Sequence, residues 1–276
     1  MLVNLKEILE ISESRKCAIG SFNTPNMTSI KSVISAAEEL NEPVIITHAQ
    51  LHEEMGLCKM DEITPVMLFF AERAKVPVCV HLDHGEDLDY IKRALELGYN
   101  SVMYDGSHLG EKDNLINTKK VVEMAKNFGA SVEAEVGSMG ARELGVCADD
   151  CIYTDPEAAA QFAEETGIDA LACAFGTVHG LHLKEPKLDF ERLAKIHSLV
   201  KIPLVMHGGS GVSIEDYQKV ISLGIRKINY YTYMAKAGGT AVSIMHDKTF
   251  FHDIEVEGMK AMKEDVIGAI KIFANK

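Results

Sequence analysis

Short apolar runs alternate along the whole chain with longer segments whose apolar residues recur at helical spacing. Residues 43–47 and 75–80 are typical of the apolar runs, and residues 61–75 are typical of the helical segments. Strands that are apolar along their whole length indicate a parallel sheet covered on both faces. About eight strand–helix units fit into the chain, which predicts a single α/β domain over residues 1–276, a (β/α)8 TIM barrel. Extra helices are expected in a tail over about residues 240–276. An open doubly wound sheet is the alternative.

Capping residues mark the expected ends of several helices. Gly98 and Gly167 directly follow helical segments, and glycine is a preferred residue where a helix ends. Thr28 and Ser213 stand where a helix begins and have side chains that cap N-termini. Another helix is expected over residues 117–128.

Charge and composition narrow the class of protein. The chain has a formal net charge of −13, which argues against nucleic acid or an anionic membrane as a partner. Hydrophobic residues make up 47%, yet no apolar run approaches the length of a bilayer span and no secretory signal pattern opens the chain. The six cysteines form no CxxC pair, which indicates buried thiols in a reducing compartment. We therefore expect a soluble cytoplasmic protein.

Titratable residues gather directly after the apolar run of residues 75–80. His81, Asp83 and His84 follow that run, and Gly85 lets the backbone turn away. Burying two imidazoles and a carboxylate costs free energy unless they are paired, and a divalent metal is the usual partner. For this segment alone, a solvent-exposed strand end with a hydrogen-bonded core histidine is the alternative.

Polar residues also lie on or after the other expected strands. They include Asp105, Ser107, Glu133, Glu135, His179, His207 and Asn229. A TIM barrel gathers the carboxyl ends of its strands at one face, so several imidazoles can converge there on one zinc ion and leave a position open for substrate. Residues 208–211 (GGSG) precede a serine-capped helix and suit a phosphate. Of the remaining histidines, His52 and His252 are expected at the surface.

Five motifs lie at the ends of expected strands: residues 82–85 (LDHG), 104–109 (YDGSHL), 133–137 (EAEVG), 176–180 (GTVHG) and 207–211 (HGGSG). Together they resemble the class II, metal-dependent ketose-bisphosphate aldolases, a family that includes fructose- and tagatose-bisphosphate aldolases. The resemblance implies a lyase of carbohydrate metabolism that cleaves a ketose phosphate to dihydroxyacetone phosphate and an aldehyde. It also implies Zn2+ as cofactor, with a monovalent cation as a further option.

The resemblance implies roles for individual residues as well. The zinc ligands would be His84, His179 and His207, and the catalytic residues would be Asp83 and Glu143, the latter on the loop after the fifth strand. The residues implied in binding the substrate and its phosphate are Asn23, Gly180, Gly208, Gly209, Ser210, Asn229 and Thr232. The residues expected to support these groups from behind are His81, Asp105, Ser107 and Glu135.

At several positions where the family contacts its substrate, this chain has a different type of residue. Tyr231 and Tyr233 stand where the family usually has small or acidic residues, and Ala49 where it usually has serine or threonine. Met259 lies where the family has an arginine that reaches the distal phosphate in a neighbouring subunit. These departures leave open whether the substrate is a bisphosphate. A ketose 1-phosphate with a different distal group, such as a non-phosphate anion, is the alternative.

Other functions stay open at this stage. Lys227 on the last expected strand could form a Schiff base in a metal-free aldolase. A zinc hydrolase on the same scaffold and a non-catalytic subunit of an aldolase assembly are further alternatives. The expected partner is a small sugar phosphate, and the family implies a homodimer or homotetramer, for which residues 244–276 could supply the interface.

Overall fold

The computed structural model describes residues 1–137, 152–177, 180, 186–245 and 250–276. Within this part of the chain eight parallel strands close into a barrel, in which each strand pairs with the next and β8 pairs with β1. The strands are β1 (Ile19–Asn23), β2 (Val44–Ala49), β3 (Val78–Gly85), β4 (Ser101–Tyr104), β5 (Ser131–Val136), β6 (Ala170–Cys173), β7 (Leu204–Met206) and β8 (Ile225–Tyr230). This closed barrel is the TIM barrel predicted from the sequence, and it excludes the open doubly wound sheet.

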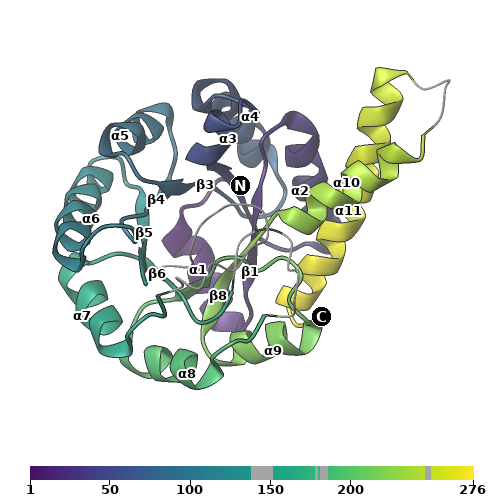
Figure 1. The fold of residues 1–276 in the computed structure, drawn as a ribbon. Coiled ribbons are helices and arrows are strands. Elements are labelled where there is room, and N and C mark those ends of the chain that lie inside the picture. The colour runs from purple at the N-terminus through teal and green to yellow at the C-terminus, as the bar shows by residue number, and fades with distance from the viewer. Residues whose placement is uncertain (138–151, 178–179, 181–185, 246–249) are drawn as a thin grey trace.

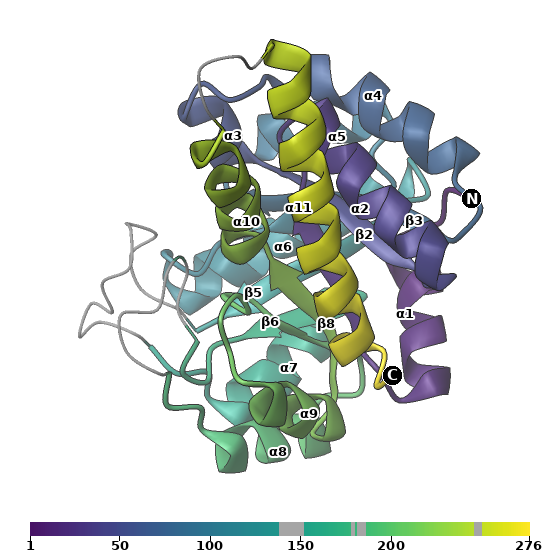
Figure 2. The same ribbon diagram turned by 90° about the vertical axis from the view of Figure 1, so that its right-hand side faces the viewer.

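Helices surround the strands (Figure 1). They are α1 (Leu5–Arg15), α2 (Met27–Leu40), α3 (Gln50–Glu54), α4 (Met60–Arg73), α5 (Leu88–Leu97), α6 (Glu111–Lys126), α7 (Pro156–Thr166), α8 (Phe190–Leu199), α9 (Ile214–Ser222), α10 (Thr232–Ser243) and α11 (Phe251–Phe273). Figure 2 shows α10 and α11 side by side outside the ring, with α11 packed against α2. These two helices form the predicted tail. No helix in the described ranges is long and apolar enough to cross a membrane.

The interior of the barrel has an apolar layer at one end and a polar layer at the other. At the amino-terminal ends of the strands, α1 packs Leu5, Ile8 and Leu9 against inward-facing residues such as Ile19 and Ile45. Asn4 caps the start of this helix, because its side chain accepts a hydrogen bond from the backbone N–H of Glu7. Since this end is sealed, access to the polar layer comes from the carboxyl ends of the strands.

The strand β3 extends further than the sequence pattern predicts. The apolar run ends at residue 80, but the strand continues to Gly85, so the titratable residues belong to the strand itself. The pairing register with β4 shifts between Leu82 and Gly85, and His84 has a φ of +46°. In a regular strand Asp83 and His84 would point to opposite faces. The irregularity lets both side chains reach the same cavity at the carboxyl end of the barrel.

Helix ends agree with the sequence at some positions and differ at others. Gly98 ends α5 with a φ of +103°, and Ser213 caps α9, as predicted. The cap of α2 is Asn26 and not Thr28, because the Asn26 side chain accepts the N–H of Ser29. The prediction for Thr28 was therefore wrong.

The start of α6 also differs from the prediction, since the helix begins at Glu111 and not at residue 117. Its first turns bury Asn114 and Thr118, which are polar, so hydrophobic spacing alone does not detect them. The charges of Glu111 and Asp113 favour a helix start there, because they lie beside the positive end of the helix dipole.

Candidate active site

The carboxylate of Asp83 lies at the floor of a cavity of about 180 Å³ at the carboxyl end of the barrel. Asn229 Nδ2 donates a hydrogen bond to Asp83 Oδ1 (3.0 Å), and Asn23 Nδ2 donates to Oδ2 (3.4 Å). Burial raises the pKa of Asp83, but the electrostatic effect of the neighbouring His84 and Lys227 outweighs burial and holds that pKa well below its usual value. The carboxylate is therefore ionised at neutral pH and can accept a proton.

His84 and His207 meet beside this carboxylate. Nε2 of His84 lies 2.7 Å from Nδ1 of His207. The other nitrogen of each ring contacts a carboxylate, Asp105 Oδ2 for His84 (2.7 Å) and Glu133 Oε1 for His207 (2.8 Å). Because ionised carboxylates accept N–H donors, these contacts put the ring protons on the outer nitrogens and leave the inner lone pairs converging on one point. A cation held by both His84 and His207 would relieve the repulsion of those lone pairs.

The donor set fits a divalent metal. Asp83, His84 and His207 each offer one ligand atom, and these atoms lie within 4.8 Å of one another. Imidazole nitrogens and carboxylate oxygens are ligands that zinc accepts, and the carboxylates behind both histidines are the outer contacts that metal-bound imidazoles usually make. A second group, His84 with Asp105 and Glu135, meets the same distance criterion. The predicted ligand His179 and the predicted catalytic Glu143 lie outside the described residues.

Asp105 is held in place by the loop that follows β4. The N–H and the hydroxyl of Ser107 both donate to Asp105 Oδ1, at 3.1 and 2.7 Å, while Oδ2 contacts His84. The backbone N–H of Asp105 donates to the carbonyl of Gly85 (2.8 Å), which ties the loop to the irregular end of β3. Ser107 thus holds the carboxylate of Asp105 in contact with His84.

A buried network of charges lies beneath the cavity. Nζ of Lys227 forms an ion pair with Oε2 of Glu133 (2.9 Å) and also donates a hydrogen bond to Oδ1 of Asn229 (2.8 Å). Burial raises the pKa of Glu133, but Lys227 and His207 lower it by more, to about 2. His81 lies in the same layer, with Nε2 3.7 Å from Glu133 Oε2. The amine of Lys227 is completely buried and engaged in an ion pair, which argues against its use as a Schiff-base nucleophile.

The opposite wall of the cavity suits a phosphate. Gly208, Gly209 and Ser210 line it, and the Ser210 hydroxyl accepts the N–H groups of Tyr231 and Thr232, both at 3.1 Å. These N–H groups begin α10, a helix of 12 residues whose N-terminal end attracts anions. A Cβ at Gly209 would lie 2.6 Å from Ile228 Cγ2, so glycine is needed for the loop after β7 to approach β8. Gly180, Asn229 and Thr232 line the same cavity, and their contacts with substrate stay a prediction.

His52 was missed by the sequence reasoning, which expected it at the surface. Its side chain lines the cavity and is only 3% exposed, and its ring lies 5.8 Å from that of Tyr231. The rule that polar residues after barrel strands face the site could have found it, since His52 follows β2 by three residues. Ala49 lines the cavity too. Met259 lies on α11, where its carbonyl accepts a hydrogen bond from α2.

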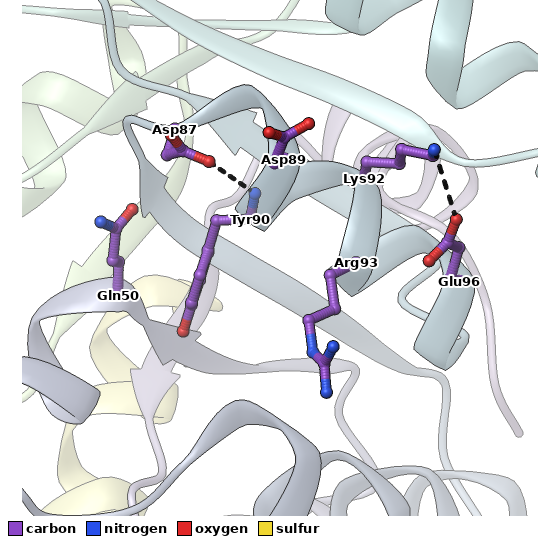
Figure 3. Close-up of a pocket in the computed structure, with 7 residues that line it drawn as sticks. All are labelled: Gln50, Asp87, Asp89, Tyr90, Lys92, Arg93 and Glu96. Atoms are coloured by element: carbon purple, nitrogen blue, oxygen red, sulfur yellow. Dashed lines mark hydrogen bonds and ion pairs between the residues drawn. The ribbon is translucent and has the colours of Figure 1, made fainter.

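Figure 3 shows a separate surface hollow, beside α5. Its lining residues include the exposed side chains of Asp89, Lys92 and Glu96, and it is open to solvent. Exposed charges of this kind keep their hydration and are not held in one arrangement, so this hollow is no second candidate active site.

A TIM barrel with histidines and carboxylates converging at the carboxyl ends of its strands, next to a helix N-terminus, defines an enzyme site suited to a metal and a phosphorylated substrate. Comparison with known proteins agrees. The sequence model of class-II fructose-bisphosphate aldolases matches residues 3–276. A fructose-bisphosphate aldolase of Staphylococcus aureus (strain Mu50 / ATCC 700699) is 38% identical over 278 residues, which cover 99% of this chain and 97% of that relative.

Solved structures give the same result. The crystal structure of the YdjI aldolase from Escherichia coli K12 superposes with a TM-score of 0.87 at 37% identity and covers 99% of this chain and 97% of that chain. The fructose-bisphosphate aldolase of Campylobacter jejuni, at 23% identity and a TM-score of 0.83 over 99% and 95% of the two chains, shares the fold. The chain belongs to the class II fructose-bisphosphate aldolase family. It is therefore an aldolase, a lyase that cleaves a carbon–carbon bond, in a family that is generally metal-dependent.

Proposed function

We propose that the protein is a zinc-dependent aldolase that cleaves a ketose 1-phosphate to dihydroxyacetone phosphate and an aldehyde. The observation that carries this proposal is the Asp83 carboxylate beside the converging nitrogens of His84 and His207. Asp83 and His84 line one cavity with the N-terminal end of α10, and His207 contacts His84 from beside it. The cavity thus combines a proton acceptor, a set of metal ligands and a place for a phosphate.

His84 and His207, with His179 from the family resemblance, would hold the zinc ion. When bound, the ion supplies electrophilic stabilisation of the negative charge that develops on the substrate oxygens. Asp83 accepts the proton of the hydroxyl β to the carbonyl, and that O–H electron pair forms the aldehyde C=O as the carbon–carbon bond breaks. Glu143, which the resemblance names for returning a proton to the enediolate carbon, stays a prediction.

The phosphate would be bound by backbone groups and not by a cation of the described wall. Gly208, Gly209 and Ser210 present the loop after β7, and Thr232 begins α10. Backbone N–H groups at a helix N-terminus bind phosphate without a lysine or arginine. Asn229 can contact the substrate as well as Asp83, because it lines the cavity while its amide donates to that carboxylate.

A retro-aldol screen tests the proposed function. Purified protein is incubated with ketose mono- and bisphosphates, and release of dihydroxyacetone phosphate is followed with a coupled dehydrogenase. We expect cleavage that a chelator abolishes and added zinc restores. Chelator-resistant cleavage with trapping by borohydride would favour the Schiff-base alternative. Protein that binds zinc but cleaves no member of the panel would favour a non-catalytic subunit.

We also propose that the chain assembles as a homodimer or homotetramer through the tip formed by α10 and α11. Ile244, Phe250 and Phe251 expose 72%, 68% and 75% of their surface at this tip, which extends away from the barrel in Figure 1. Exposed apolar groups that lie together mark interaction surfaces. Light scattering should give a multimer for the natural chain and a smaller species for Phe251→Asp, whereas equal masses would argue against this interface.

A further inference from the structure

His52 lies on α3, directly after β2, and forms part of the cavity wall. Nδ1 of His52 accepts the backbone N–H of Ala49 (3.2 Å), so in the neutral ring the proton lies on Nε2. Among the described residues Nε2 makes no hydrogen bond, although His52 is only 3% exposed. The neighbouring lining residues Leu51 and Met55 are apolar. An imidazole N–H of a residue that lines a substrate cavity is suited to a ligand acceptor.

A second row of contacts holds the ring in place. His48 packs against His52 with ring centroids 5.4 Å apart. The Tyr90 hydroxyl donates to Glu53 Oε2 (3.1 Å), so His48 Nε2 donates to that hydroxyl oxygen (3.1 Å). Nδ1 of His48 then accepts from the thiol of Cys58 (3.7 Å). Figure 3 shows Tyr90 extending from α5. These hydrogen bonds hold the ring of His48, against which the ring of His52 packs edge to face.

The described wall of the cavity is also short of positive charge. None of its described lining residues is a lysine or an arginine. The N-terminal end of α10 suits one phosphate, and the side of the cavity lined by Leu51, His52 and Met55 offers no cation for a second one. Burial lowers the pKa of His52 to about 4, so the ring is neutral at pH 7 and does not attract an anion. Among the described lining residues, no cation compensates for the desolvation of a phosphate at this wall.

We propose that His52 is a specificity-determining residue that donates a hydrogen bond from Nε2 to an uncharged hydroxyl in the distal half of a ketose 1-phosphate, and that this wall disfavours a second phosphate. The inference rests on the proposed aldolase function and adds the substrate class. It accounts for the histidine and for the absence of arginine at Met259 with one substrate: a monophosphate whose far end is neutral.

The test compares two acceptors that differ only in the distal phosphate. The zinc-loaded enzyme condenses dihydroxyacetone phosphate with glyceraldehyde or with glyceraldehyde 3-phosphate, each as the D and the L form. We expect the higher kcat/KM for glyceraldehyde by about 10-fold or more, because a phosphate there is desolvated without a partner. Equal or higher kcat/KM for the phosphorylated aldehyde, or condensation with neither, would overturn the inference.

Two variants of similar size separate the donor from the bulk of the ring. His52→Gln can place an N–H near the position of Nε2, whereas His52→Asn can replace only Nδ1. We expect His52→Asn to lower kcat/KM for glyceraldehyde about 10-fold, mainly through KM, and His52→Gln to restore most of it. The affinity for dihydroxyacetone phosphate alone, measured by calorimetry, should not change. An equal loss for both aldehydes in both variants would show a structural role only.

The two hypotheses fail in different ways. If no ketose phosphate is cleaved and no aldehyde is condensed at all, the proposed function itself is wrong. If cleavage occurs and the bisphosphate is preferred, the enzyme is an aldolase and only the role of His52 is wrong. Because the two aldehydes are compared with the natural protein, this comparison distinguishes the two outcomes even if a variant fails to fold.

Discussion

Nζ of Lys227 lies 2.9 Å from Oε2 of Glu133, and both side chains are completely buried in the barrel. The pair connects β8 to β5 across the interior, and Glu133 also contacts Nε2 of His207 at 2.8 Å. The ion pair therefore stands behind one of the proposed metal ligands. It also engages the lysine that a Schiff-base mechanism would need as a free amine.

Removing this lysine should destabilise the fold. Lys227→Met leaves Glu133 as a buried carboxylate without its cation, and we expect the free energy of unfolding to fall by about 3–5 kcal/mol. Urea denaturation measures the change. The double variant Lys227→Met with Glu133→Gln should recover part of the loss because it removes the unpaired charge. If the single variant is as stable as the natural chain, the pair does not have this role.

Metal binding should depend on the two converging histidines. His84→Ala and His207→Ala each remove a ligand from the site, so the metal content measured by mass spectrometry should fall well below that of the natural protein. His252→Ala is the matched control, since its side chain is exposed on α11. Loss of metal in the control, or full retention in both site variants, would contradict the assignment.

Asp83→Asn tests the proton acceptor. The amide cannot take up the hydroxyl proton, so we expect kcat to fall about 10²- to 10⁴-fold, while most of the bound metal is kept by the histidines. Steady-state kinetics and metal analysis of the same sample separate the two effects. An active variant would show that another group removes the proton.

Asp105 should tune the metal through His84. Its Oδ2 contacts the outer nitrogen of His84, so Asp105→Asn should weaken metal affinity about 10- to 100-fold. Ser107→Ala should have a smaller effect, because Ser107 touches only Oδ1. Competition with a fluorescent chelator gives both affinities, and a reversed order of the two effects would rule out this role for Asp105.

Stability should fall in mild acid because buried histidines are neutral. Burial lowers the pKa of His48 to about 3 and that of His52 to about 4, from 6.5 in the unfolded chain. The unfolded chain binds protons below pH 6.5 that the folded chain excludes, so the free energy of unfolding decreases from pH 6.5 toward pH 4. Each group contributes up to about 1.4 kcal/mol per pH unit. Urea titrations of His52→Gln should show a shallower slope, and an unchanged slope would contradict this assignment.

The order of strands and helices follows from local patterns, and most of it could be predicted. Gly98 and Ser213 act at helix ends through their own backbone or side chain, so their positions suffice. The extent of β3 could not be predicted, because the polar residues after the apolar run are paired with β2 and β4, which lie elsewhere in the sequence. The same holds for the start of α6, where the polar residues Asn114 and Thr118 are buried by other parts of the barrel.

The sequence by itself determined the class of fold, the apolar layers, and the motifs that mark Asp83, His84 and His207, since each depends on residues close together in the chain. Only the tertiary structure decided that Lys227 pairs with Glu133 and that His52 faces the cavity. Both depend on closure of the barrel, which brings distant strands together and buries His52, which the sequence pattern assigns to the surface.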